Sequence, residues 1–434
     1  AQDPIRADLW SPERLEEHAE SIARRRVLAR GKNGRRSPRV QDSGRVLLQC
    51  YRDIAAVIRD EGATTPAAEW FVDNFHIVEA VARQVREDLP LGFYRQLPKL
   101  ADDPLEGYPR VLGLAWAFVA HTDSRVEPDT LQRFVRAFQR VQPLTIGELW
   151  AVPIALRIVL LENLRRLAER IVTGRAARQA ADALANDLLG LAGRPAQPLA
   201  FQGRPAADLS TAFTVELVQR LREQDPQSTP ALRWLDEQIA KRGGSPDELV
   251  QAEHQSQAAM NVTVRNVITS LRMMSTLDWA DFFESVSLVD DTLRAATRFG
   301  DMDFATRDQY RHAIEDLARG SRRSELEVTR LAMAVARRAA PGARAQDPGY
   351  HLLAEGRPLF EKEIGYHIPT RRWLVRAFLT SATPRYLATI AVVTGALLGL
   401  PLLAGYASGM SGVGVALLTL FAVIPPSDLA IALV

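Results

Sequence analysis

The apolar residues of this chain recur at three- and four-residue intervals, the spacing that gives an α-helix one buried face. No stretch shows the sustained alternation of a β-strand, and no fixed repeat period emerges. The pattern therefore predicts an all-α protein. The expected helices cover approximately residues 11–30, 45–61, 66–88, 108–122, 128–140, 143–173, 206–224, 230–241, 246–276, 278–299, 303–319, 321–340 and 351–364.

Residues 174–206 are poor in aromatic side chains and end in Gly and Pro, which predicts a boundary between two helical subdomains. Pairs such as Thr65-Pro66 and Ser245-Pro246 mark helix starts, because Ser or Thr caps the helix and proline is tolerated in the first turn. The expected domains are a basic N-terminal arm and helix (1–45), a helical subdomain with an aromatic and polar core (46–195), a second helical subdomain (196–368), an interfacial amphipathic helix (369–383) and two transmembrane helices (384–434).

The C-terminal region differs from the rest because residues 386–427 contain no charged side chain. About 20 apolar residues span a bilayer as a helix, so the runs 386–403 and 412–424 predict a transmembrane hairpin. Arginines between residues 371 and 385 precede the first run, and the positive-inside rule places that side in the cytoplasm. A buried helical hairpin is the alternative. The last residues are apolar again, so we expect a piece of a longer polypeptide.

Composition narrows the class of protein further. The 434 residues exceed one ordinary domain, and a net charge of +2 carries no nucleic-acid signature. Cys50 is the only cysteine and lies in an apolar helical pattern, so we expect a core thiol in a reducing compartment. The arginine-rich segment 24–45 is either a solvated linker or an arm that lies on anionic lipid.

The stretch 64–166 combines aromatic residues with polar residues embedded in apolar helical faces. Such polar groups are hydrogen-bonded when buried, so they predict either a core network or a recognition surface. The candidate residues of a recognition surface, for a ligand or a neighbouring domain, are Trp70, Tyr94, Arg95, Tyr108, Arg110, Trp116 and Trp150. The candidate members of a buried polar network are Glu69, Asp73, His76, His121, Asp123, Arg125 and Glu148.

Three patterns suggest chemistry, and each has a structural alternative that we favour. Glu69, Asp73 and His76 share one helical face, which would suit a metal, but a further ligand pair is missing nearby. The run 121–124 (HTDS) suggests a hydrolase triad, yet helix termination explains it better. The D-x-D at 301–303 precedes a helical run and indicates a helix cap. We therefore predict no catalytic, cofactor-binding or metal-binding residue in this chain.

Several long segments resemble the N-terminal region of bacterial cyclic β-1,2-glucan synthases. They are TPAAEWFVDNFHIVE (65–79), DLPLGFYRQLPKLADDPLEGYPRVLGLAWAFVAHTDSR (88–125), VQPLTIGELWAVPIALRIVLLENLRRLAERI (141–171), SLRMMSTLDWADFFESVSLVDDTLR (270–294), MDFATRDQYRHAIEDLARGS (302–321) and SELEVTRLA (324–332). The resemblance extends over residues 5–434 at uneven strength.

This resemblance implies a large inner-membrane enzyme that polymerises glucose from UDP-glucose, with a divalent metal, into a β-1,2-linked glucan. The glycosyltransferase domain of that family, with its D-x-D and Q-x-x-R-W motifs, is expected beyond Val434. The first hypothesis is accordingly the cytoplasmic and membrane-anchoring part of such a synthase. In this hypothesis it docks on the transferase domain, and the recognition residues named above contact that domain or the growing glucan. The alternatives are a non-enzymatic, membrane-anchored helical scaffold that binds a protein partner, and an independent enzyme that uses Glu69, Asp73 and His76.

Overall fold

The computed structural model describes residues 2–25, 40–61, 64–88, 91–101, 105–189, 210–223, 229–241, 244–340, 342–368 and 382–422. These residues form helices and no strand, apart from one antiparallel bridge between Lys99 and Pro109, which confirms the all-α prediction. The chain divides into two compact units, residues 1–292 and residues 293–434. Most of the expected basic arm (26–39) and of the interfacial helix (369–381) lies outside the described residues.

The helices of the first unit are α1 (Pro12–Arg25), α2 (Val40–Glu61), α3 (Pro66–Asp73), α4 (Phe75–Asp88), α5 (Leu91–Gln96), α6 (Arg110–His121), α7 (Pro128–Gln139), α8 (Ile146–Leu189), α9 (Thr211–Arg222), α10 (Thr229–Lys241), α11 (Pro246–Thr276) and α12 (Trp279–Val286). Helix α13 (Leu288–Arg294) follows. The second unit contains η3 (Arg298–Asp301), α14 (Phe304–Ser321), α15 (Glu325–Arg338), η4 (Arg344–Gln346), α16 (Pro348–Leu352), α17 (Arg357–Ile364), α19 (Ala382–Ala407) and α20 (Gly412–Ala422).

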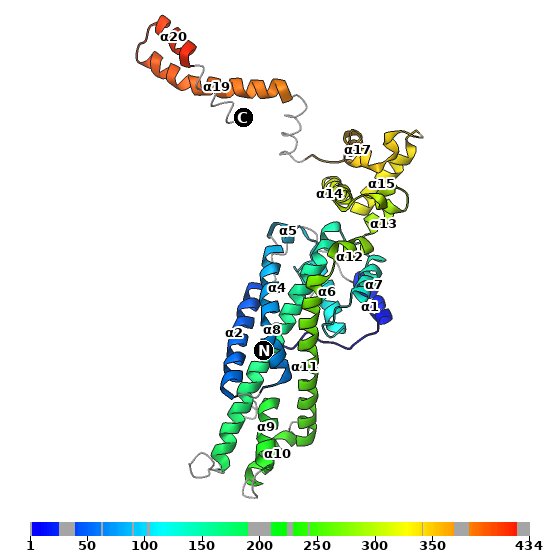
Figure 1. Cartoon of the computed structure of the whole chain (residues 1–434), viewed down its shortest axis with the longest axis vertical. Helices are drawn as coiled ribbons and strands as arrows, with labels where there is room; N and C mark the ends of the chain where they lie inside the picture. The colour runs from blue at the N-terminus through cyan, green and yellow to red at the C-terminus, as the bar shows by residue number, and fades with distance from the viewer. Residues whose placement is uncertain are drawn as a thin grey trace. The chain divides into compact units, whose positions relative to one another are not determined.

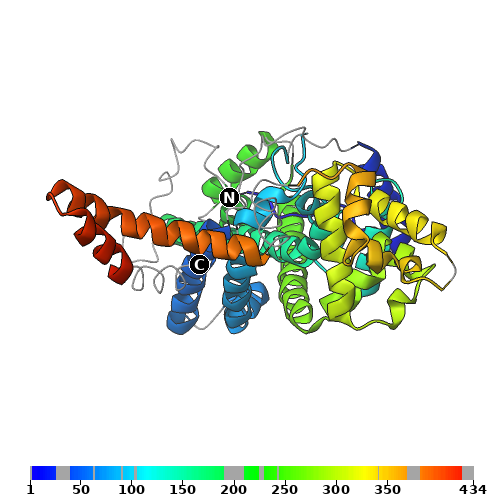
Figure 2. The ribbon, with the colours of Figure 1, turned by 90° about the horizontal axis from the view of Figure 1, so that it is seen from above.

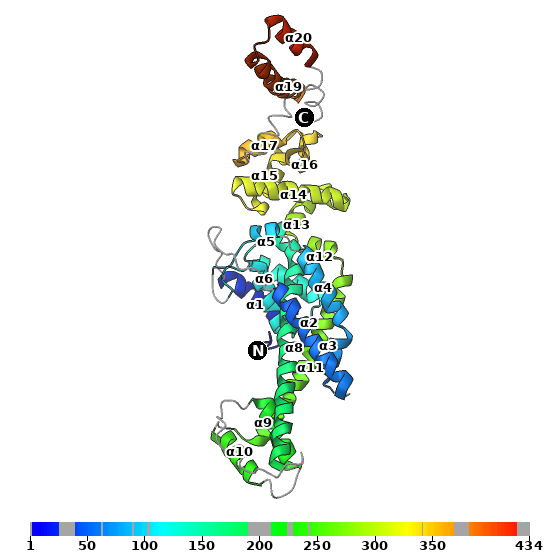
Figure 3. The same cartoon turned by 90° about the vertical axis from the view of Figure 1, so that its left-hand side faces the viewer.

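Helix α8 is the axis of the first unit, with 44 residues. Its first half is buried on nearly all sides, and it packs against α2, α6, α9 and α11 (Figures 1 and 3). The apolar run 149–161 suits this position, because a helix surrounded by others has no polar face to present to water. Helices α3, α4, α9 and α12 also contact α8 or α11, α7 packs on α12, and α1 packs on α6 and α7.

The boundary expected near residue 195 lies inside the first unit. Helices α9 and α10 pack against the C-terminal part of α8 through Ala181, Leu184, Leu217, Leu221 and Leu235. The composition of residues 174–206 does change, but α8 continues to Leu189 and carries the apolar positions on which α9 rests. The actual division falls near residue 292, which composition did not mark.

In the second unit, α14 packs against α15, and the short helices α16 and α17 close the group. Backbone and side chain meet closely at Gly320, where a Cβ would lie 2.1 Å from the ring of Tyr366. Tyr310 donates a hydrogen bond from its hydroxyl to Asp347 at 3.0 Å, which ties α14 to the cap of α16. The helices of this unit are therefore stabilised in part by tyrosine side chains that pack closely against the backbone of neighbouring segments.

Helices α19 and α20 lie side by side and are joined by a tight turn at Gly409, which has a left-handed φ of 76° (Figures 1 and 2). Among the described residues one helix is long and apolar enough to cross a membrane, over Leu387–Gly405. The described part of α20 has 11 residues, fewer than a membrane span needs. Of these two packed helices, only α19 is long and apolar enough to cross a membrane among the described residues, so the structure supports one candidate membrane helix and does not show the predicted transmembrane hairpin.

Candidate functional site

A buried ion pair joins two residues that the sequence analysis had placed in different groups, Arg110 and Glu148. The Arg110 guanidinium at the start of α6 donates two hydrogen bonds to the Glu148 carboxylate, at 2.8 and 2.5 Å, and Glu148 is fully buried. Arg110 also donates to the Gln142 side chain and the Pro143 carbonyl, both at 3.1 Å. The pair is therefore saturated by internal bonds, as a buried ion pair must be to offset desolvation.

The same carboxylate begins helix α8. Glu148 accepts a hydrogen bond from the backbone N–H of Thr145 at 3.0 Å, while the Thr145 hydroxyl accepts one from the Glu148 N–H at 3.2 Å. This reciprocal arrangement is a capping box, and its T-x-x-E signature stands before the apolar run in the sequence. The structure thus assigns Glu148 to a helix start and an interhelical clamp, which confirms its place in a buried network.

The turn after α6 is a second polar centre. Asp123 and Ser124 have left-handed φ angles of 49° and 63°, which Asp tolerates better than most residues. The Asp123 carboxylate accepts hydrogen bonds from Thr263 at 2.6 Å and Asn266 at 3.2 Å, both on α11. The HTDS motif is therefore a helix terminus that is anchored to α11, and the capping interpretation is confirmed.

Asn163, near the middle of α8, completes this centre. Its side-chain oxygen accepts from the Ile5 N–H at 2.7 Å, and its amide donates to the Ile5 carbonyl at 3.2 Å and to the Ser124 hydroxyl at 2.8 Å. One fully buried side chain thus holds the extended N-terminal segment, the turn after α6 and α8 together. The sequence analysis missed Asn163, although a lone Asn inside the run IALRIVLLENL was the available signal.

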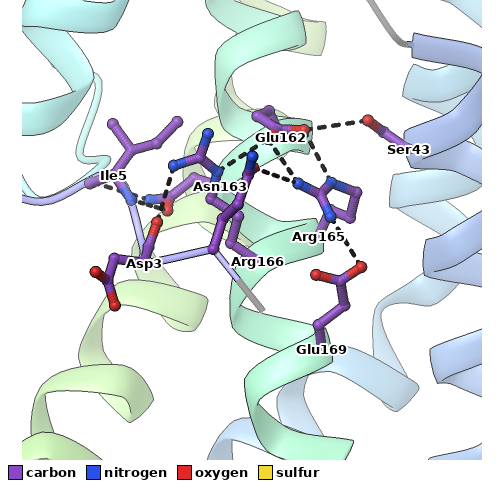
Figure 4. A network of polar contacts seen from close by, with 9 residues as sticks. Asp3, Ile5, Ser43, Glu162, Asn163, Arg165, Arg166 and Glu169 are labelled. Atoms are coloured by element: carbon purple, nitrogen blue, oxygen red, sulfur yellow. Dashed lines mark hydrogen bonds and ion pairs between the residues drawn. The ribbon is translucent and has the colours of Figure 1, made fainter.

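Beside it, Ser43, Arg165 and Arg166 converge on Glu162, as Figure 4 shows. Burial alone would raise the pKa of Glu162, but the bonds from the two arginines outweigh burial and lower that pKa. Arg165 also donates to Glu169 at 2.8 Å. The i,i+3 and i,i+4 spacing of these charges on one helix was the sequence signal for this cluster.

The tryptophans proposed as glucan contacts lie on separate elements, and each is half-buried. The Arg166 guanidinium lies 5.1 Å from the ring centroid of Trp116, and Arg265 lies 5.6 Å from that of Trp70. Trp150 stacks on Phe283 of α12 with ring centroids 4.5 Å apart. The rings are therefore engaged with different helices and do not line one shared groove.

The remaining contact candidates surround the bridge between residues 99 and 109. Tyr94 is buried, and the Lys99 ammonium lies 3.6 Å from its ring centroid and donates to its carbonyl at 2.7 Å. Burial lowers the pKa of Lys99 to about 8. Tyr108 is half-buried and accepts from the Leu100 N–H, whereas Arg95 is exposed.

Part of the predicted buried network is on the surface instead. Glu69, Asp73 and His76 are exposed. Helix α3 ends at Asp73 and α4 begins at Phe75, so the three side chains are not on one continuous helix. Their spacing had indicated a shared face, but the helical face that is buried here carries Ala67, Phe71 and Phe75.

The two remaining members of the predicted network, Arg125 and His121, are also at least partly exposed to solvent. Arg125 is exposed and pairs with Glu127 at 2.6 Å. His121 is half-buried, stacks on Trp10 with centroids 3.5 Å apart, and has its Nδ1 2.8 Å from the Asp8 carbonyl. Together with Asn163, His121 therefore attaches the N-terminal segment to the body of the first unit.

Two further motifs follow the structural interpretation that the sequence favoured. Asp303 caps α14 and accepts hydrogen bonds from the Thr306 N–H at 2.8 Å and the Thr306 hydroxyl at 2.9 Å. These bonds lower the pKa of Asp303. Cys50 is buried, and burial raises its pKa to about 11, so the thiol is not primed as a nucleophile. Among the described residues no group of three or more His, Cys, Asp or Glu side chains is arranged to hold a metal ion.

No protein-family model matches the chain. The chain is similar to the cyclic beta-(1,2)-glucan synthase NdvB of Rhizobium meliloti (strain 1021), with 37% identity over 363 residues. The match covers 81% of this chain and 13% of NdvB, so the chain spans about an eighth of that relative. The chain is therefore related to one region of a cyclic β-(1,2)-glucan synthase.

Proposed function

We propose that this region is a non-catalytic helical support within a cyclic β-(1,2)-glucan synthase, attached to the inner membrane with its helical body on the cytoplasmic side. In this role it docks against the glycosyltransferase domain of the same polypeptide, which polymerises glucose from UDP-glucose. The similarity to NdvB supports the glucan synthase role. The support role is carried by one observation: the buried polar residues of stretch 64–166 have their hydrogen-bond partners inside the protein.

That observation is specific. Glu148, Asn163 and Asp123 are each buried, and each has its oxygens bound by neighbouring helices or by the N-terminal segment. A catalytic carboxylate would instead face a cleft where a substrate atom can reach it. The arrangement suits a rigid part of the protein that supports another domain and carries out no chemistry itself. In this proposal the divalent metal for glucosyl transfer is held by the glycosyltransferase domain.

The apolar helix α19 supports attachment to the membrane, because its 19-residue segment Leu387–Gly405 has a mean hydropathy of 2.2. Such a segment is long enough to span a bilayer. The docking surface is proposed to be on the first unit, where Trp70, Arg95 and the exposed acidic residues of α3 offer aromatic and charged groups.

The test uses a full-length synthase that contains this region. Residues 1–368 are deleted while α19 and everything after it are kept, and glucose transfer from UDP-glucose into β-1,2-glucan is measured in membrane vesicles. We expect at least a tenfold loss of glucan per molecule of synthase in the membrane. Arg125→Ala, which removes only an exposed ion pair, serves as the control and should retain full synthesis. Undiminished synthesis by the deleted enzyme would refute the proposal.

A further inference from the structure

A cleft of about 460 Å³ opens between α2, the segment before α3, α8 and α9, away from the polar centres described above. Its floor is apolar and consists of Ile54, Val57, Ile171, Val172 and Ala176. The volume lies within the range of about 300–1,000 Å³ that small-molecule sites occupy in proteins. All of these elements belong to the first unit, so the cleft is formed within one compact body.

Polar groups of both signs surround that floor. They are Asp53, Arg175, Arg178, Gln179, Asp182 and Glu216. Arg220 holds Asp182 with its Nε at 3.1 Å, and Gln49 donates to Asp53 at 2.8 Å. Burial raises the pKa of Glu216, and the charge of Asp182 adds to this effect. The lining therefore offers carboxylate, guanidinium and amide groups in an almost balanced mixture.

One hydroxyl in this cleft lacks a partner. The Oγ1 atom of Thr65 is buried and has no hydrogen-bond partner among the described residues, and Thr65 lines the cleft. Thr65 is the N-cap of α3, yet its side chain makes no capping bond. Instead Asn261, on α11, accepts from the Ala67 N–H at 3.0 Å and satisfies that helix terminus. The Thr65 hydroxyl is thus left for something that enters the cleft.

The chemistry of the lining selects among ligand classes. Three carboxylates against two guanidiniums do not favour a phosphate group, which prefers a net positive site. The described carboxylates also form no cluster for a metal ion. A neutral ligand with an apolar face and a polar edge fits best, because its ring carbons can rest on the aliphatic floor while its hydroxyls meet the rim.

We propose that this cleft binds two or three glucose units of a β-1,2-linked glucan. This inference rests on the proposed function, which brings such a chain to this protein. Arg178, Gln179 and the Thr65 hydroxyl donate to sugar oxygens, and Glu216 accepts or donates according to its protonation. Among the described residues that line the cleft none is aromatic, so in this proposal hydrogen bonds rather than ring stacking set the affinity.

The test measures binding of the linear β-1,2-linked glucose trisaccharide to the full chain in detergent micelles, by calorimetry. We expect saturable binding that Thr65→Val weakens about two- to tenfold, the effect of one lost hydrogen bond. Gln179→Ala should weaken binding to a similar extent. Thr173→Val is the matched control: its hydroxyl bonds the Glu169 carbonyl on α8 and does not line the cleft. It should leave the affinity unchanged.

Other outcomes would overturn the proposal. Equal affinity of wild type and Thr65→Val, tighter binding of inorganic phosphate than of the trisaccharide, or the absence of binding would each do so. The two proposals fail separately. In one case the trisaccharide does not bind, but deletion of residues 1–368 still abolishes synthesis. This result would refute glucan binding in the cleft and would leave the proposed support role intact. A deletion without effect would instead remove the support role, whatever the trisaccharide does.

Discussion

At the scale of single residues, the Arg110–Glu148 pair is a buried ion pair whose side chains are 4% and 0% exposed. Arg110→Met leaves an ionised carboxylate in a site with no exposure, so we expect a loss of about 3–5 kcal/mol in the free energy of unfolding. Chemical denaturation followed by tryptophan fluorescence measures this loss. The double variant Arg110→Met/Glu148→Leu should lose much less, because no unpaired charge remains.

The matched comparison is Arg125→Met, which breaks an ion pair whose side chains are 69% and 49% exposed. Exposed pairs contribute at most about 1 kcal/mol. If Arg110→Met were as mild as Arg125→Met, the buried pair would not be the clamp described here.

Lys99 predicts a pH dependence at the same scale. Burial lowers the pKa of Lys99 from 10.5 to about 8 in the folded chain. Between these two values the unfolded chain binds more protons, so stability from this group rises with pH across that window and is lowest below pH 8. Relative to Lys99→Met, the wild type should gain about 1–2 kcal/mol of unfolding free energy between pH 7.5 and 9.5. A constant difference across that range would contradict the assignment.

At the scale of elements, Asn163 attaches the N-terminal segment to helix α8 of the bundle. Its side chain bonds both the N–H and the carbonyl of Ile5, a residue 158 positions away. Asn163→Leu removes the hydrogen-bond partners of the Ile5 N–H and of the Ile5 carbonyl. We therefore expect amide hydrogen exchange of residues 2–10 to accelerate by at least tenfold. Exchange within α11 should change little. Asn74→Leu, which loses a bond to the Trp70 carbonyl on the same stretch of chain and one from Arg272, is a control for removing a partly exposed amide.

Helix starts were predictable from the sequence because a cap is a local structure. Ser245 and Glu248 form the capping box of α11, and Thr145 and Glu148 form that of α8. Each box lies within four consecutive residues, so its signature can be read without knowledge of the fold. The end of α8 was not predictable in this way. The apolar positions of residues 174–189 (Ala177, Ala181, Leu184, Ala185 and Leu188) follow helical spacing but are mostly alanine, and they are buried because α9 packs on them.

At the scale of the whole molecule, the turn between α19 and α20 offers a test of orientation. Ser411 lies in that turn and is exposed, and Cys50 is the only native cysteine. In a Cys50→Ala background of this 434-residue chain, expressed in a bacterial inner membrane, Ser411→Cys should react with a membrane-impermeant maleimide from the periplasmic side of intact cells. Thr276→Cys, exposed on the helical body, should react only after the membrane is permeabilised. The reverse pattern would invert the proposed orientation.

The candidate site was only partly predictable. Arg110, Asp123 and Glu148 were singled out because polar residues within an apolar pattern must find partners, and the structure shows those partners. Glu69, Asp73 and His76 follow the same pattern but are exposed. The difference lies in the break at Asn74, which ends one helix and starts the next. A helical wheel drawn through that break predicts a face that does not exist.

The sequence by itself determined the helical class, the helix caps, the membrane-length apolar run and the resemblance to cyclic β-(1,2)-glucan synthases. These features depend on local spacing or on the order of residues along the chain. Only the tertiary structure decided which polar residues are partners, because the bonded residues are 38, 140 and 158 positions apart. It also decided where the cleft lies, since its walls come from helices that composition had assigned to two different domains.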